Sequence, residues 1–385
     1  LLKTERSPCT RGTFLFKGTS SMPWTPGHRL LLAWTADVIA GRAGSAPCGW
    51  PTDRLIAIAS AERVLPILST GAAFADPAMR ASVGTGIRNA VLLDLTRRAC
   101  SALAGASVPV MLLKGIDLCE RVYGNPALRP MHDVDLLVPR ASIPPALAAI
   151  STVGLRAEEA PGEGVLRHSV VLSGPPPLRP HIHLHWHVAN ASYPLPYAET
   201  IDLEGLWGRS IPWTGAPGAA RVPSPEDLAV YLCEHLVKHC CEEWIFAVDL
   251  LLTLRRLRPD PPAFARIARS WGVEHLCEAA LRVVEGLFPR LGAGAFRDLV
   301  GPVPLTHLEH VFVRQVLSGR RSAGVNWLVY LAHCPTTRAR ARQLWKGVFP
   351  DAADLASLDP EEAARGRWTA YAQRGWKAVE RILGR

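Results

Sequence analysis

Three common signals are missing from this chain of 385 residues. No stretch of 18 uncharged apolar residues occurs, so the sequence predicts no membrane-spanning helix. The apolar run at residues 30–40 resembles a signal sequence only weakly, because Asp37 interrupts it. No Cys-x-x-Cys pair occurs among the nine cysteines, and their number is odd. These absences argue against a disulfide framework and a thiolate zinc site, and they favour a cytoplasmic location.

Lysine is also scarce: the chain has 43 Lys plus Arg residues, and only six of them are lysines. The net charge is +9, which favours phosphate-bearing partners without demanding nucleic acid. Hydrophobic residues make up 48% and charged residues 20% of the chain. That composition is ordinary for a globular protein and excludes wholesale disorder and fibrous repeats.

The sequence pattern divides the chain into four parts. Residues 1–51 begin with a stretch rich in Ser, Thr, Gly and Pro, and we expect them to be poorly structured. Helical spacing of apolar residues predicts a helical layer over 52–104. Short apolar runs, read as strands, predict an α/β core over 105–222; they lie at 108–113, 134–138, 165–172 and 181–188. Ser224, followed by Pro225 and two acids, is a strong helix start and opens a helical region over 223–385.

Asp133 and Asp135 carry the sharpest chemical signal. They lie two residues apart at the beginning of a predicted strand, so their side chains project from the same face while Val134 and Leu136 point into the core. Two carboxylates at such close range repel each other unless a cation lies between them. Mg²⁺ binds one or two carboxylates together with substrate phosphates, which is the arrangement used in phosphoryl and nucleotidyl transfer.

Lys114 and Gly115 form the second signal. They follow a predicted buried strand and precede a short predicted helix, so the backbone N–H groups of the turn could bind a phosphate. Lys114 would add a point charge beside that phosphate. An ordinary tight turn with a surface lysine is the alternative interpretation.

These motifs, taken in order, resemble a bacterial nucleotidyltransferase-like family within the DNA polymerase β-type superfamily. The resemblance runs from about residue 52 to the end of the chain. It is carried by the Lys-Gly turn, Leu128-Arg129-Pro130-Met131 leading to Asp133 and Asp135, His183-Leu184-His185-Trp186, the segment from Ser224 through His235, His239 and Trp244 to Asp249, and Trp345-Lys346-Gly347-Val348-Phe349-Pro350.

The resemblance implies a small mixed sheet flanked by helices. It assigns Lys114 and Gly115 to the triphosphate, and Asp133 and Asp135 to Mg²⁺ or Mn²⁺, with an NTP as substrate. Arg129 is carried over as a motif residue, and contact with a phosphate and a brace beneath the loop are equally plausible for it.

His183 departs from the family pattern. Superfamily members commonly place a third carboxylate on a neighbouring strand, and here His183 stands at that position. The exchange removes a negative charge and a hard oxygen ligand, although a neutral imidazole can still accept a proton near pH 7. His183 is therefore a candidate catalytic base, and it is equally a sign of weakened or lost activity.

Two sets of histidines each share one face of a predicted strand or helix. Residues 181, 183, 185 and 187 are all histidines and share one face of a predicted strand; we expect no metal there, because no acid is seen nearby in the sequence. His235 and His239 share a face of a predicted helix, but the His-Glu-x-x-His zinc motif is absent. We expect packing and polar contacts for that pair, with Asp249 as a partner for one of them.

The sequence thus predicts a metal-dependent enzyme that transfers a nucleotidyl group from an NTP to an acceptor hydroxyl. The acceptor could be a small molecule, a peptide or a protein; nucleic acid is possible but not indicated. A degenerate, non-catalytic module that binds a nucleotide or a partner is the second hypothesis. A transition-metal protein with histidine ligands is a weaker third.

Overall fold

The structure of the chain is a computed structural model. It describes residues 23–42, 50–71, 75–158, 168–175, 179–189, 200–215, 220–321, 325–334 and 336–349, with a few isolated residues beyond 365. None of the helices in these ranges is both long enough and apolar enough to cross a membrane.

A mixed sheet of seven strands forms the centre of the α/β part, as predicted, in the order β3-β4-β5-β2-β1-β7-β6. The pairs β2–β5 and β1–β7 are parallel, and the other neighbouring pairs are antiparallel. The strands are β1 (Met111–Leu112), β2 (Asp133–Leu137), β3 (Arg156–Ala157), β4 (Ser169–Ser173), β5 (His181–His185), β6 (Ile211–Pro212) and β7 (Arg221–Val222). Residues 165–167, at the start of one predicted strand, lie outside the described residues.

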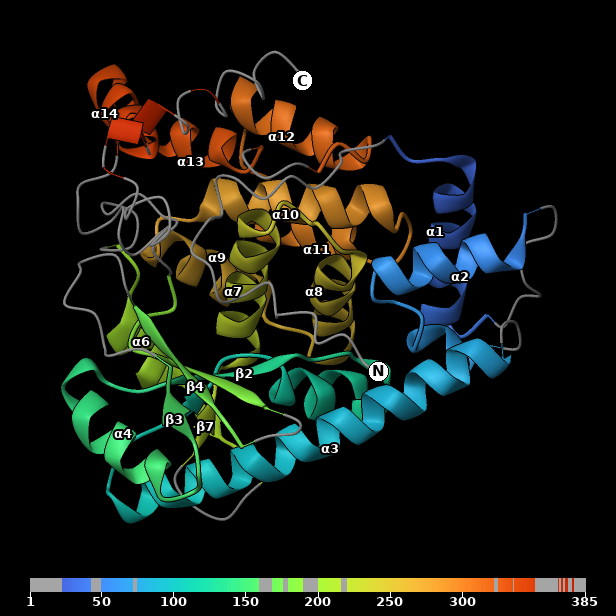
Figure 1. The fold of residues 1–385 in the computed structure, drawn as a ribbon. Helices are drawn as coiled ribbons and strands as arrows, with labels where there is room; N and C mark the ends of the chain where they lie inside the picture. The colour runs from blue at the N-terminus through green and yellow to red at the C-terminus, as the bar shows by residue number, and fades with distance from the viewer. Residues whose placement is uncertain are drawn as a thin grey trace.

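Helices surround this sheet (Figure 1). The first three are α1 (Pro26–Ile39), α2 (Thr52–Ala61) and α3 (Ala75–Gly105), and α4 (Ile143–Ser151) and α6 (Leu203–Arg209) lie between strands. The C-terminal region contains α7 (Pro225–Lys238), α8 (Trp244–Arg256), α9 (Pro261–Ser270), α10 (Glu274–Leu287), α11 (Ala293–Val300), α12 (His307–Leu317), α13 (Trp327–His333) and α14 (Thr337–Val348). Four short helical turns lie in the first half of the chain: η2 (Ile67–Thr70), η3 (Leu118–Tyr123), η4 (Pro126–Leu128) and η5 (Arg140–Ser142).

The two faces of the sheet pack against different helices. On one face, Val134 and Leu136 of β2 join Ile182 and Leu184 of β5 in a core shared with α3 and α4. On the other face, Leu137 belongs to a second core that contains side chains of α7 and α8. In Figure 1 the long α3 runs below the sheet and the C-terminal helices lie above it. The polar residues of β2 and β5 therefore project toward the C-terminal helices, because side chains alternate along a strand.

The prediction that residues 1–51 are poorly structured is wrong for α1. Leu31, Leu32 and Trp34 of this helix are buried in the core that also contains the C-terminal helices. The run at 30–40 that resembles a signal sequence is thus an amphipathic helix that packs on the rest of the chain. Burial of its apolar side chains stabilises this helix, although the segment begins with a stretch rich in polar residues. Residues 1–22 and 43–49 lie outside the described residues.

The helix start at Ser224 is confirmed. The Ser224 hydroxyl accepts a hydrogen bond from the backbone N–H of Asp227 at 3.1 Å, and Pro225 is the first residue of α7. This cap fixes where α7 begins, and α7 then carries His235 toward the sheet.

Candidate active site

Strand β2 presents Asp133 and Asp135 on the face that points toward α7 and α8. Between them, Val134 is fully buried in the opposite core, as the alternation predicts. The two acids differ in exposure, because the Asp133 side chain is 22% exposed and the Asp135 side chain is 7% exposed. Asp133 is thus partly open to solvent, whereas Asp135 is covered by neighbouring side chains.

Parallel pairing with β5 places His183 beside both acids. The register sets Asp135 opposite His183. The Nε2 atom of His183 lies 3.7 Å from Asp133 Oδ2, and its Nδ1 atom lies 3.8 Å from Asp135 Oδ1. The imidazole therefore lies between the two carboxylates, on the face where the sequence-based hypothesis requires it.

His185 is also part of this group. Its Nε2 atom lies within hydrogen-bond distance, 2.9 Å, of Asp135 Oδ1. Ligand atoms of Asp135, His183 and His185 all lie within 4.8 Å of one another. The expectation that no acid lies near the histidine face is therefore wrong. Burial lowers the pKa of His185, although Asp135 opposes that shift.

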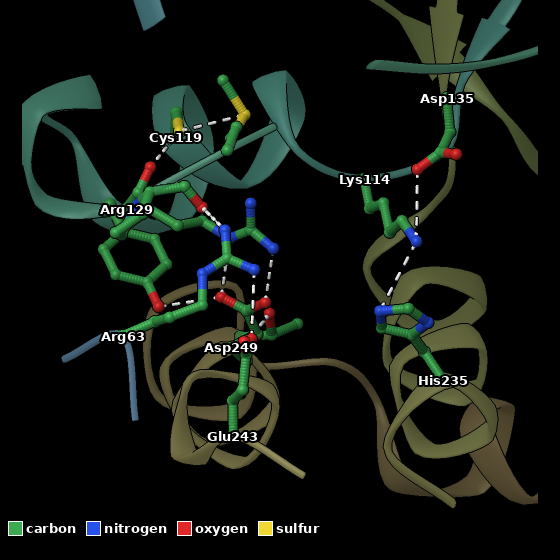
Figure 2. A network of polar contacts seen from close by, with 12 residues as sticks. Arg63, Lys114, Cys119, Arg129, Asp135, His235, Glu243 and Asp249 are labelled. Carbon is green, nitrogen blue, oxygen red and sulfur yellow. Dashed lines mark hydrogen bonds and ion pairs between the residues drawn. The ribbon is translucent and has the colours of Figure 1, made fainter. Parts of the chain in front are cut away.

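Lys114 reaches the same carboxylate from the turn after β1. The Leu113 backbone N–H donates to the Asp135 carbonyl at 3.1 Å, which brings the next residue alongside β2. Lys114 Nζ lies 3.2 Å from Asp135 Oδ2 and 3.4 Å from Nε2 of His235 on α7 (Figure 2). Burial alone would raise the pKa of Asp135, but Lys114 and His185 hold that pKa well below its usual range.

The charge on Lys114 is stabilised in return. Burial alone would lower the pKa of Lys114, but Asp135 and then Tyr231 raise it above its usual value. Lys114 and Asp135 thus form a buried ion pair. The alternative of a solvated surface lysine is wrong, since the Lys114 side chain is only 18% exposed.

His235 was not singled out from the sequence as a site residue. It is buried on α7, its ring centroid lies 4.4 Å from that of His239, and its Nε2 atom accepts from Lys114. Burial and then Lys114 hold the pKa of His235 well below its ordinary value. Asp249, which was expected to bond one of these histidines, accepts hydrogen bonds from Arg129 at both of its carboxylate oxygens.

Gly115 occupies a turn that only glycine fits easily. Its φ is +63°, and an added Cβ atom would lie 3.2 Å from the Met131 sulfur atom. The left-handed backbone and this close approach both favour glycine. The turn holds Lys114 beside β2.

Arg129 is a brace in this structure. Its guanidinium donates from Nε and Nη2 to the two carboxylate oxygens of Asp249 at 2.8 and 2.6 Å, and Tyr123 donates to the same carboxylate. Figure 2 shows this pair and the Lys114 pair as separate groups of contacts. Arg63 supports the same loop by donating to the Pro130 carbonyl at 2.8 Å. These contacts match the brace, which is one of the two roles expected for Arg129.

The donor atoms present fit a divalent cation. Asp133 and Asp135 offer carboxylate oxygens on one face of the sheet, and His183 and His185 add imidazole nitrogens beside them. Carboxylates suit hard ions such as Mg²⁺ and Mn²⁺, whereas imidazole suits transition metals. Asp133 does not belong to the group of Asp135, His183 and His185, whose ligand atoms all lie within 4.8 Å of one another.

Comparison with known proteins identifies the family to which this chain belongs. A family model described as an uncharacterised nucleotidyltransferase matches residues 51–289, which is more than half of the chain. The chain belongs to this nucleotidyltransferase family. The match spans the Lys-Gly turn, β2 and β5 with their acids and histidines, and α7 with His235.

The other comparisons are less informative. No curated protein sequence matches the chain. The solution structure of the antibiotic-resistance factor ANT(2'')-Ia is similar with a TM-score of 0.34 and 13% identity, covering 48% of this chain and 92% of that one. A likeness this distant identifies no substrate for this chain.

Proposed function

We propose that this member of the family transfers a nucleotidyl group from an NTP to an acceptor hydroxyl in a reaction that requires Mg²⁺ or Mn²⁺. The acceptor oxygen forms a bond to the α-phosphorus, and the bond from that phosphorus to pyrophosphate breaks. The observation that carries the proposal is the convergence of Asp133, Asp135 and Lys114 on one face of the sheet in a chain of this family.

Each residue has a role that its position supports. Asp133 and Asp135 would hold the cation, which when bound neutralises charge that develops on the phosphate oxygens. Lys114 stays protonated in its buried pair and supplies a positive charge beside the site. Gly115 forms the turn that positions Lys114. The backbone N–H groups of that turn would bind an incoming triphosphate.

His183 occupies the position of the third acid and has two possible uses. As a base, one of its ring nitrogens would accept the proton of the acceptor hydroxyl. As a ligand, the same ring would replace a carboxylate oxygen at the cation. Both uses fit an imidazole that lies 3.7 Å from Asp133 and 3.8 Å from Asp135.

A non-catalytic binding module is the second candidate, and one observation favours it. Both oxygens of Asp135 already have partners, with Lys114 at 3.2 Å and His185 at 2.9 Å. These contacts satisfy Asp135 without a metal ion, as a non-catalytic site would require.

We also propose a cytoplasmic location, because all seven described cysteines are free.

The test is pyrophosphate release from each NTP with Mg²⁺ or Mn²⁺ and a pool of hydroxyl acceptors. Asp133→Asn and Asp135→Asn should each lower the rate at least about 100-fold, because each removes a charged ligand worth several kcal/mol in the transition state. Asp94→Asn is the matched control: Asp94 is an exposed acid on α3 that pairs with Arg98. Wild-type rates in both site variants would contradict the metal assignment, and nucleotide binding without pyrophosphate release would favour the binding module.

A further inference from the structure

Among the residues that the structure describes, two histidines and one acid form a group whose ligand atoms all lie within 4.8 Å of one another. Asp135 comes from β2, and His183 and His185 come from β5. All three lie on one face of two strands that pair in parallel, so the backbone hydrogen bonds of the sheet fix their spacing. All three side chains are at most 12% exposed.

The three ligand atoms lie within 4.8 Å of one another, and the two separations that involve Asp135 are close to what one small metal ion requires. Two ligand atoms that each lie about 2.0–2.1 Å from a tetrahedral Zn²⁺ are about 3.3 Å apart. Asp135 Oδ1 lies 2.9 Å from His185 Nε2 and 3.8 Å from His183 Nδ1. These values lie on either side of the ideal, so small rotations of the side chains would bring the atoms around an ion.

We propose that Asp135, His183 and His185 form a Zn²⁺ site with three protein ligands and an open position. Two histidines and one carboxylate, with a fourth position left for water or substrate, is a donor set found in catalytic zinc sites. An N/O site also binds Zn²⁺ more tightly than Mn²⁺, and imidazole disfavours Mg²⁺. The inference rests on the proposed function for its use in transfer, and it resolves the role of His183 as that of a ligand.

Neighbouring groups hold the ligands in place. Lys114 contacts the second oxygen of Asp135, Oδ2, and leaves Oδ1 directed at the two imidazoles. Asp133 Oδ2 lies 3.7 Å from His183 Nε2, the nitrogen that does not face Asp135. A carboxylate that accepts a hydrogen bond from a ligating histidine fixes its tautomer and orientation. At 3.7 Å Asp133 is beyond hydrogen-bond distance, so a small approach of the two side chains would be needed for this role.

The experiment is calorimetric titration of the metal-free full-length chain with Zn²⁺, and separately with Mg²⁺, in the absence of nucleotide. We expect one Zn²⁺ per chain and much weaker binding of Mg²⁺. His183→Ala should weaken Zn²⁺ binding on the order of 100-fold or more, since even partners of ligating residues are worth 10–100-fold. His183→Asp should reduce the difference between the affinities for Zn²⁺ and Mg²⁺, because it restores an oxygen ligand.

His181→Ala is the matched control for these variants. His181 lies on the same strand and face, but it contacts Ser173 and Glu158 instead of the proposed ligands. This variant should bind Zn²⁺ as the wild type does. A second measurement, the rise in Tm on adding Zn²⁺, guards against misfolding: it should be large in the wild type and in His181→Ala, and small in His183→Ala.

The outcomes separate this inference from the proposed function. Equal affinities for Mg²⁺ and Zn²⁺, or unchanged Zn²⁺ binding in a folded His183→Ala variant, would overturn the zinc site. Pyrophosphate release with Mg²⁺ by a chain that lacks a zinc site would leave the proposed function standing. Tight Zn²⁺ binding without pyrophosphate release from any NTP would support the zinc site and contradict the proposed function.

Discussion

At the scale of single residues, the main feature is a buried lysine. It lies beside one ionised acid and several neutral histidines. Lys114 pairs with Asp135, and His235 lies on its other side. Burial lowers the pKa values of His185, His235 and His239, which keeps these imidazoles neutral beside the ammonium group. The charge on Asp135 is thus balanced by one lysine, and the histidines keep their lone pairs for hydrogen bonds or a metal.

The neutral histidines predict how stability depends on pH. Their pKa values are lower in the folded chain than in the unfolded chain, so unfolding takes up protons in mild acid. This contribution to stability is complete above the ordinary histidine value of about 6.5 and is lost as the pH falls below it. These three histidines should therefore lower the free energy of unfolding between pH 7 and pH 5, by up to about 1.4 kcal/mol per pH unit for each histidine. Glu234 opposes part of this fall, because burial raises its pKa to about 7.

His235→Gln tests this account. The amide keeps a hydrogen-bond acceptor for Lys114 but does not titrate, so the slope of stability against pH should become shallower by about one proton. Urea unfolding at several pH values measures that slope. His310→Gln, at an exposed position on α12, should leave the slope unchanged. An identical slope in His235→Gln and the wild type would show that His235 is not the group that titrates.

Local signals identified several site residues, but not their partners. Asp133, Asp135, Lys114 and Gly115 are recognisable because a strand, a turn and the spacing of two acids are all local features. His185 and His235 could not be assigned in the same way, because their partners lie 50 and 121 residues away along the chain. Such contacts depend on which strands pair and which helix covers them.

At the scale of elements, β2 is anchored at its beginning by the buried pair of Arg129 and Asp249. Asp249 lies on α8, and the pair joins that helix to the loop that carries the polypeptide into β2. Both side chains are nearly inaccessible to solvent, at 8% and 0% exposure. The pair thus sets how the strand that bears Asp133 and Asp135 meets the C-terminal helices.

Removing one member of this pair should be costly. Arg129→Met leaves the Asp249 carboxylate buried without its cation, so we expect a loss of roughly 3–5 kcal/mol in the free energy of unfolding. Arg98→Ala is the control: it breaks an exposed pair with Asp94 on α3 and should cost at most about 1 kcal/mol. Chemical denaturation measures both. Similar small losses in the two variants would contradict the role of Arg129 as a brace.

The sequence predicted individual helices and strands where their signals were local. It did not predict how the strands pair. The helix start at Ser224 and the alternation along β2 and β5 appear in the structure as expected. The parallel register that sets Asp135 beside His183 has no local signal, because it depends on the chain between the two strands. For the same reason α1, whose apolar side chains are covered by distant helices, was missed.

At the scale of the whole molecule, the candidate site lies where the sheet meets the C-terminal helices. One face of β2 and β5 is filled by apolar residues against α3 and α4, and the other carries the acids and histidines toward α7. The helical region therefore contributes His235 directly to the surroundings of the site. The family model also extends beyond the sheet into these helices, to residue 289.

The central claim is nucleotidyl transfer, and the fate of the label tests it most directly. The full-length chain is incubated with one NTP labelled at the α-phosphate or at the γ-phosphate, a divalent metal and a pool of acceptors. We predict that the α-label moves to an acceptor product while the γ-label appears in pyrophosphate, and that both movements stop in Asp135→Asn. Transfer of the γ-label to a product, or no movement of either label with Mg²⁺, Mn²⁺ or Zn²⁺, would contradict the claim.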